Sequence, residues 1–204
     1  QMHEVIGSGQ RGIGILHAVL HEEHTRRLKI FRCGFQRVEE GAFQRFVAFV
    51  FLEEGFDHFE EGHHMLAAVL RQLAAHAEVL AIGPGLGRSE WSQSLFHAAV
   101  ALGLPSVIDA DGLNLLAITQ TRVPDAVLSP HPGEAARLLG TDVPTVERDR
   151  FGAAQALVER FDAVVVLKGA GSIVAAPGRV PVVIGAGNPG MATGGMGDVL
   201  TGTI

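Results

Sequence analysis

Residues 185–198 read Gly-Ala-Gly-Asn-Pro-Gly-Met-Ala-Thr-Gly-Gly-Met-Gly-Asp, and the rest of the chain is best understood from this stretch. The residues that follow, 199–204, are typical of the start of a helix. Glycines let backbone N–H groups converge on an anion, and a helix N-terminus adds unpaired donors and a positive dipole end. An ionised Asp198 beside such donors suits phosphoryl transfer, because it can take the proton of an attacking hydroxyl. A glycine-rich turn with a capping aspartate fits the same residues.

Upstream of this stretch, short apolar strands alternate with glycine-rich loops and helices. The apolar runs predict strands over 78–82, 105–108, 126–129 and 163–167, followed by a hairpin over 173–184. The expected helices follow Ser89, Asp111 and Gly133, and a further one begins at Asp142 or Thr145 and runs to Phe161. Such repeats predict an α/β fold, a three-layer α/β/α sandwich with a mainly parallel central sheet.

Two glycine loops follow predicted strands, at the edge where open α/β sheets bind ligands. Residues 83–87 read Gly-Pro-Gly-Leu-Gly, and residues 168–172 read Lys-Gly-Ala-Gly-Ser. A lysine followed by small residues suits a diphosphate, because the ammonium supplies charge and the glycines expose backbone donors. Residues 168–172 are not a Walker A loop, and a strand-end turn with a solvated lysine is the alternative.

Polar residues follow two other strands. Asp109 and Asp111 could hold Mg²⁺ or order ligand groups, although Asp111 could instead cap the next helix. Two prolines flank His131 and forbid a helix before Gly133. A histidine held so rigidly at a strand end favours a functional role over packing.

The run 187–200, with the loops described above, resembles the signature of the ADP/ATP-dependent NAD(P)H-hydrate dehydratases, which belong to the ribokinase-like superfamily. The resemblance covers residues 78–204. It implies ADP-dependent dehydration of (6S)-NADHX or NADPHX, the hydrated nicotinamide cofactors, to NADH or NADPH. The implied route is phosphorylation of the ring hydroxyl followed by loss of phosphate, with ADP or ATP and Mg²⁺ as cofactors.

The resemblance also assigns roles to individual residues. Asp198 is the catalytic base and a substrate contact, and Glu134 stands where related kinases carry an acid that orders metal-bound water. A ligand role for Asp109 or Asn114 stays open. The other substrate contacts are Gly83, Gly85, Gly87 and His131. The nucleotide contacts are Lys168, Gly169, Ala170, Gly171, Ser172, Asn188, Gly195 and Gly197.

Residues 1–77 do not share the resemblance and are expected to be a divergent or non-family segment. Residues 7–12 match G-x-G-x-x-G, with a helix conceivable over 13–27 and a strand over 28–31. No acid follows that strand closely, so a glycine-rich turn is the default interpretation. Five histidines near acidic residues indicate a solvated face rather than a metal site, namely His21, His24, His58, His63 and His64. Six phenylalanines indicate core or interface, namely Phe43, Phe46, Phe49, Phe51, Phe56 and Phe59.

The composition excludes several classes of protein. The 204 residues are 47% hydrophobic and 19% charged, which predicts a soluble globular chain. A net charge of −6 argues against nucleic acid, and the lack of a long apolar run argues against a membrane. The single Cys33 excludes an internal disulfide and favours the cytoplasm. From its ends, the chain is expected to begin inside something longer and to be truncated at its C-terminus.

The expected partners are the small-molecule substrate, a second copy of the chain in a homo-oligomer, and an epimerase domain or partner. Two alternatives to the dehydratase stay open. A ribokinase-like kinase of a vitamin precursor would share the anion site and the terminal aspartate, although His131 and Glu134 favour the dehydratase. The second alternative is a nucleotide-binding remnant without catalysis, because the family's N-terminal substrate segment is not found and the chain ends abruptly.

Overall fold

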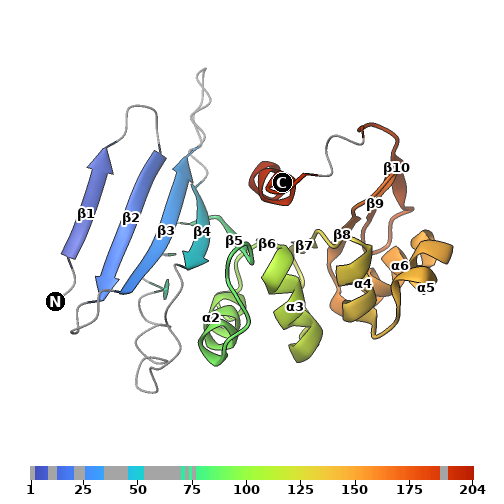
Figure 1. The fold of residues 1–204 in the computed structure, drawn as a ribbon, viewed down its shortest axis with the longest axis horizontal. Coiled ribbons are helices and arrows are strands. Elements are labelled where there is room, and N and C mark those ends of the chain that lie inside the picture. The colour runs from blue at the N-terminus through green and yellow to red at the C-terminus, as the bar shows by residue number, and fades with distance from the viewer. Residues whose placement is uncertain are drawn as a thin grey trace. The chain divides into compact units, whose positions relative to one another are not determined.

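A computed structural model of the chain describes residues 3–8, 13–20, 26–34, 46–52, 70, 71, 74, 77–188 and 193–204. The chain divides into two compact units, Gln1–Pro105 and Ser106–Ile204, and each is described here by itself. Figure 1 labels most of the helices and strands of both units. Within the described ranges, no helix combines the length and the apolar character that crossing a bilayer requires.

The described residues of the N-terminal unit include five strands and the helix that follows the glycine loop. The elements are β1 (His3–Ser8), β2 (Ile13–Leu20), β3 (Arg26–Gly34), β4 (Phe46–Leu52), β5 (Val79–Ile82) and α2 (Glu90–Val100). Strands β1 to β4 pair antiparallel in chain order, and β5 joins β4 in parallel. The change of direction at β5 marks the start of the α/β pattern predicted from residue 78 onward.

The helix considered over 13–27 is wrong, because residues 13–20 form strand β2. Strand β2 pairs antiparallel with β1, with Ser8 opposite Gly14. A dinucleotide fingerprint needs a helix after its glycines, so the 7–12 motif is not one. The β-branched residues Ile13, Ile15 and Val19 favour a strand over a helix here. The turn itself falls on residues 9–12, outside the described residues.

Several residues that were singled out in this segment lie outside the described residues. They are the five histidines considered as metal ligands and Phe43, Phe56 and Phe59. Phe46, Phe49 and Phe51 belong to β4, for which the structure describes the backbone. The expectations of a solvated face and of a phenylalanine core therefore stay predictions.

Helix α2 begins as predicted at Ser89. The Ser89 side chain caps the helix by accepting a hydrogen bond from the backbone N–H of Ser92 at 3.3 Å. Its predicted apolar face is buried through Trp91, Leu95, Phe96 and Ala99. This burial fixes α2 directly after the glycine loop that follows β5.

The C-terminal unit carries the strands from which the candidate site is built. Its strands are β6 (Ser106–Ile108), β7 (Ala126–Leu128), β8 (Val164–Leu167), β9 (Ser172–Ala175) and β10 (Val182–Ile184). Its helices are α3 (Ala110–Thr119), α4 (Pro132–Leu139), α5 (Val143–Arg148), α6 (Arg150–Phe161) and α7 (Met196–Thr203). Strands β6, β7 and β8 are parallel neighbours, and the predicted hairpin is confirmed by the antiparallel pairing of β9 with β10.

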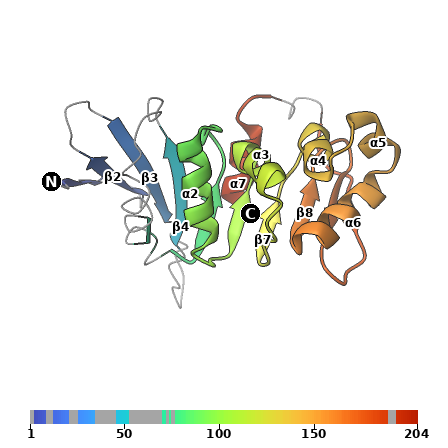
Figure 2. The ribbon, with the colours of Figure 1, turned by 90° about the horizontal axis from the view of Figure 1, so that it is seen from below.

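The core of this unit explains why its strands read as continuous apolar runs. Ile108, Leu128, Val165 and Leu167 are fully buried on these strands. Helices α4, α5 and α6 pack together, and α6 contacts β8 (Figure 2). They contribute side chains such as Leu138 and Leu157 to the same core. The strands of such a core carry mostly apolar side chains, as expected for a covered parallel sheet.

The single helix expected from Asp142 or Thr145 to Phe161 is wrong, because the structure divides it into α5 and α6. Asp142 caps α5 through the backbone N–H of Thr145 at 2.9 Å. Asp149 stands between the helices with φ −139° and caps α6 through the N–H of Gly152 at 2.8 Å. A second capping aspartate thus restarts the helix and makes Arg150 the first residue of α6.

The cap of α5 gives a pH-dependent prediction. Hydrogen bonds from the side chain and then the backbone of Thr145 hold the pKa of Asp142 below its ordinary value. A lowered folded-state pKa stabilises the fold above the unfolded pKa of about 3.9, and this stabilisation is lost as the pH falls through the folded-state pKa. We expect Asp142→Ala to lower the urea midpoint of unfolding at neutral pH, and the difference in midpoint between the variant and wild type to become smaller in acid. A difference in midpoint that is independent of pH would contradict this account.

Candidate active site

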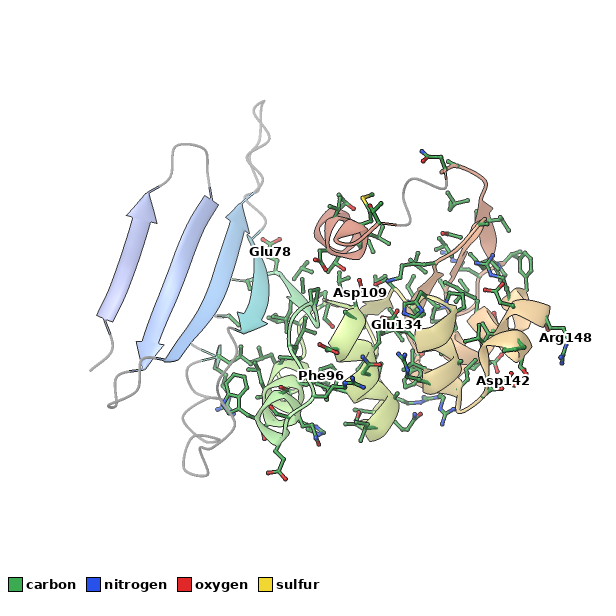
Figure 3. All side chains as sticks on the ribbon, viewed as in Figure 1. Glu78, Phe96, Asp109, Glu134, Asp142 and Arg148 are labelled. Atoms are coloured by element: carbon green, nitrogen blue, oxygen red, sulfur yellow. The ribbon has the colours of Figure 1, made fainter. Side chains whose placement is uncertain are left out.

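Three loops leave the same edge of the C-terminal unit, because β6, β7 and β8 run in parallel. Asp109 directly follows β6, and Lys168 directly follows β8. The Lys168 Nζ atom lies 2.8 Å from Asp109 Oδ1 and 3.7 Å from Glu134 Oε2. Glu134 comes from α4, which follows β7. Figure 3 labels Asp109 and Glu134, the two carboxylates that face this ammonium.

Asp109 is the centre of this cluster. Its side chain is 2% exposed, and it accepts hydrogen bonds from Lys168 Nζ at Oδ1 and from the Thr201 hydroxyl at Oδ2. Asp109 occupies the N-cap position of α3 without capping it through its side chain. Both carboxylate oxygens are therefore turned toward Lys168 and α7 rather than toward their own helix.

The expected cap at Asp111 is wrong. Asp111 lies inside the first turn of α3, where its Oδ1 accepts a hydrogen bond from Asn114 Nδ2 at 3.1 Å. Asn114 Oδ1 in turn accepts from Arg137 Nη1 at 2.9 Å. The helix starts two residues earlier than the capping pattern predicted, so the cap position falls on Asp109.

The predicted anion site at the glycine stretch lies at the start of α7. Gly195 occupies the N-cap position with φ +85°, and no side chain caps the helix. A Cβ atom on Gly197 would lie 3.2 Å from Asp109 Oδ2 and 3.8 Å from Lys168 Nζ. The N-terminal end of α7 and the lysine ammonium therefore lie close together, as an anion site requires.

Thr201 is a site residue that the sequence analysis missed. It is 3% exposed, and its hydroxyl donates to Asp109 Oδ2 at 3.1 Å. Thr201 lies four residues after Gly197, so both face Asp109 from one side of α7. The available signal was this four-residue spacing of a glycine and a hydroxyl in the predicted helix.

Asp198 lies in the first turn of α7, one residue after Gly197, and its side chain is exposed. One residue along a helix turns the side chain by about 100°, so Asp198 does not share the face of Gly197 and Thr201. Among the described residues, no hydrogen bond or ion pair engages its carboxylate. The carboxylate is therefore accessible to a ligand beside the anion site, and its catalytic role stays a prediction.

His131 and Glu134 form a reciprocal cap at the start of α4. His131 Nδ1 accepts from the N–H of Gly133 at 3.0 Å and of Glu134 at 3.4 Å, and Glu134 Oε2 accepts from the His131 N–H at 2.8 Å. The helix therefore begins at Pro132, one residue before the expected limit. This structural role of His131 was not predicted from the sequence. About half of the His131 side chain is still exposed.

Glu134 is buried, and its Oε1 atom has His131 Nε2 at 3.5 Å as a long contact. In the part of the chain that the structure describes, no three histidine, cysteine or acidic side chains gather as a metal site. Mg²⁺ in nucleotide enzymes is bound by one or two carboxylates together with phosphate oxygens and water. Glu134 Oε1 fits the indirect role expected for it, as an acceptor for a metal-bound water.

The 168–172 loop has the conformation that its glycines predict. Gly169 and Gly171 have φ of +149° and +67°, values that favour glycine. The Lys168 N–H donates to the Pro130 carbonyl at 2.8 Å, and the Ser172 hydroxyl donates to the Gly169 carbonyl at 3.2 Å. The guanidinium of Arg150 donates hydrogen bonds to main-chain carbonyls of this loop. No role for Arg150 was predicted from the sequence.

The remaining predicted contacts are placed as follows. The 83–87 loop belongs to the N-terminal unit, where Gly83, Gly85 and Gly87 all have positive φ. The Leu86 N–H donates to the Gly83 carbonyl at 3.0 Å and the Leu86 side chain is buried, so the loop is a tight turn. Asn188 is exposed and directly precedes residues 189–192, which lie outside the described residues.

Solved structures with a similar fold belong to the ribokinase-like class. A ribokinase-like superfamily protein from Enterococcus faecalis has a TM-score of 0.59 and 29% identity, covering 66% of this chain and 48% of that one. The ADP/ATP-dependent NAD(P)H-hydrate dehydratase from Bacillus subtilis, co-crystallised with ATP and Mg²⁺, has a TM-score of 0.54 and 26% identity, covering 66% and 55%. The predicted α/β class and the ribokinase-like fold are confirmed.

The family follows from the sequence comparisons. The NAD(P)H-hydrate dehydratase family matches residues 50–204. The bifunctional NAD(P)H-hydrate repair enzyme Nnr of Coxiella burnetii is 50% identical over 143 residues, covering 69% of this chain and 29% of that protein. The enzyme of the same name from Escherichia coli is 48% identical over 142 residues, covering 70% and 28%. The chain belongs to the NAD(P)H-hydrate dehydratase family and spans less than a third of these two relatives.

Proposed function

We propose that the chain carries out the ADP-dependent dehydration of NADHX and NADPHX, returning NADH and NADPH. One observation carries the proposal. The uncapped N-terminus of α7 and the Lys168 ammonium meet at Gly197, and the buried Asp109 holds both in place. Membership of the dehydratase family and the ATP and Mg²⁺ of the Bacillus subtilis relative support this assignment.

The geometry suggests how the residues would divide the work. The N–H groups of Gly195 and Gly197, with the Lys168 ammonium, would stabilise the phosphoryl group as it leaves ADP. The accessible Asp198 would take the proton of the nicotinamide ring hydroxyl, whose oxygen then bonds to phosphorus while AMP departs. The ring carbon–oxygen bond then breaks with loss of phosphate, and a neighbouring ring carbon gives up a proton. Phosphorylation helps because phosphate is a far better leaving group than hydroxide.

Binding of the two ligands would use the flanking loops. The amides of 169–172 would hold the nucleotide phosphates. Asn188, in the first half of the glycine stretch, would also contact the nucleotide. The exposed part of His131 would hold the hydrated nicotinamide, and a substrate contact at the 83–87 turn stays a prediction from the sequence. Mg²⁺, when bound, would neutralise the phosphate oxygens, and Glu134 Oε1 would accept a hydrogen bond from one of its waters.

The assay that tests the proposal follows the absorbance of restored NADPH when the protein is given NADPHX and ADP. We expect restoration that depends on ADP and yields AMP and phosphate in equal amounts. AMP formation with a vitamin precursor, without restoration of NADPH, would replace the proposal with the kinase. ADP binding by calorimetry with neither reaction would leave a nucleotide-binding remnant.

The oligomer and the cellular location belong to the same proposal. The relatives are named bifunctional repair enzymes, so we propose that an epimerase activity supplies substrate to this one. We further propose a homo-oligomer in the cytoplasm, which sedimentation of the purified protein and fractionation of cells would test. A monomer in solution, or recovery outside the cytoplasm, would contradict these two parts.

Gly197 offers a direct test of the anion site. The Cβ atom of Gly197→Ala would lie 3.2 Å from Asp109 Oδ2, so the Asp109 carboxylate or α7 must give by a few tenths of an ångström and the anion site is disturbed. We expect kcat/KM for NADPHX to fall roughly tenfold, the effect of about 1.4 kcal/mol in the transition state. Gly194→Ala is the matched control, because a Cβ atom there meets nothing within 4 Å. Equal activities of the two variants would argue against the proposed site.

A further inference from the structure

Arg150 donates hydrogen bonds to main-chain carbonyls of the 168–172 loop and of the residue before it. Its Nη1 atom donates to the carbonyls of Ala170 at 2.7 Å and Gly171 at 3.2 Å. Its Nη2 atom donates to the carbonyls of Leu167 and Lys168, both at 3.3 Å. One guanidinium therefore contacts four carbonyls, a use of the planar arginine fork that a lysine cannot reproduce.

These contacts decide where the loop amides point. In a planar trans peptide, the carbonyl of one residue and the N–H of the next point in opposite directions. Because the carbonyls of Lys168 and Ala170 are drawn to Arg150, the N–H groups of Gly169 and Gly171 face away from it. Among the described residues, neither N–H forms a backbone hydrogen bond. Two donors are thus presented on the side of the loop opposite the guanidinium.

The glycines and the arginine fit each other sterically. A Cβ atom on Gly169 would lie 2.7 Å from Arg150 Nη2, which leaves no room for one. Gly169 also has φ +149°, a conformation that other residues rarely adopt. The absence of a side chain at Gly169 is therefore what allows the guanidinium to reach the carbonyls.

Arg150 is directed at the protein and not at a ligand. Its side chain is 16% exposed, and Glu147 Oε2 lies 4.0 Å from its Nε atom. The division of the predicted helix at Asp149 places Arg150 at the start of α6, beside the loop. Resting on the proposed function, we propose that Arg150 is a positioning residue that holds the 168–172 loop with its amides turned toward the diphosphate of the nucleotide.

The test compares Arg150→Ala with Arg148→Ala, a matched removal of an exposed arginine two residues earlier on α5. We expect Arg150→Ala to raise the KM for ADP at least tenfold, with kcat within about threefold of wild type. Guanidinium chloride, compared with equal sodium chloride, should restore ADP affinity to Arg150→Ala alone. Arg148→Ala should match wild type.

Calorimetry with ADP keeps this proposal separate from the proposed function. If wild type fails to restore NADPH yet binds ADP, the loss of ADP affinity in Arg150→Ala still supports the positioning role. Should Arg150→Ala fail to fold, Arg150→Lys keeps the charge without the fork, and we expect it to bind ADP at least fivefold more weakly. Wild-type ADP affinity in a folded Arg150 variant, or no rescue by guanidinium, overturns the proposal.

Discussion

We expect Asp198→Asn to lower the rate of NADPHX dehydration by about 10²–10⁴-fold, the usual contribution of a general base. The amide has nearly the same shape but cannot take the proton of the ring hydroxyl. Among the described residues, no hydrogen bond or ion pair of Asp198 would be lost, so the fold should be unaffected. ADP affinity should stay within about twofold of wild type, since the proposed nucleotide contacts beside Asp198 are the backbone N–H groups of Gly195 and Gly197, which the substitution keeps.

Single-turnover measurements with saturating ADP separate this loss from slow product release. Glu90→Gln is a matched control, because Glu90 is also an acid in the first turn of a helix and lies outside the proposed site. The control should leave the rate unchanged. Wild-type turnover by Asp198→Asn would remove Asp198 from the mechanism and leave the anion site as the remaining catalytic feature.

The second large effect concerns the ion pair of Lys168 with Asp109. Lys168→Met would leave the Asp109 carboxylate 2% exposed with the Thr201 hydroxyl as its remaining donor in the cluster. Breaking a buried pair on one side costs about 3–5 kcal/mol. The Lys168 side chain is 22% exposed, so water can reach the cluster and we expect about 2–4 kcal/mol.

A double-mutant cycle measures this coupling. Asp109→Asn, Lys168→Met and the double variant are compared by urea unfolding, and the double variant should be more stable than the sum of the single losses predicts. We expect a coupling of at least about 1 kcal/mol, since residues in one ion-pair network do not act independently. Additive losses would show that the pair does not organise the site.

The same variants report on ADP binding. Lys168→Met removes the only ammonium of the described cluster and should weaken ADP affinity by about 10–100-fold. Asp109→Asn keeps the charge of Lys168 but loosens its position and the contact with α7, so we expect a smaller loss of affinity and a larger loss of kcat. Equal effects of both substitutions on affinity would mean that Asp109 contributes through charge alone.

Much of the C-terminal unit could be predicted because its signals are local. The strands at 106–108, 126–128 and 164–167 are largely apolar runs bounded by turns, and each contributes buried residues to the core. The failures are local as well. Asp149 restarts a helix that the apolar pattern would have continued, and β-branched residues turn 13–20 into a strand.

The site divides differently between sequence and structure. Motif and resemblance indicated the loops at 83–87, 131–134, 168–172 and the glycine stretch, because glycine, proline and lysine at strand ends constrain the backbone locally. They did not indicate that Asp109 joins Lys168 to α7, or that Arg150 orders a loop on another element.

The residue types alone indicate where each strand ends and where the backbone must be glycine. Which side chains share a charge or a hydrogen bond depends on the fold. Thr201 and Asp109 are 92 positions apart along the chain, and Lys168 and Asp109 are 59 apart. The physical reason is that such pairs depend on the order and direction of the strands, which bring distant loops to one edge, and no short stretch of residues encodes that order.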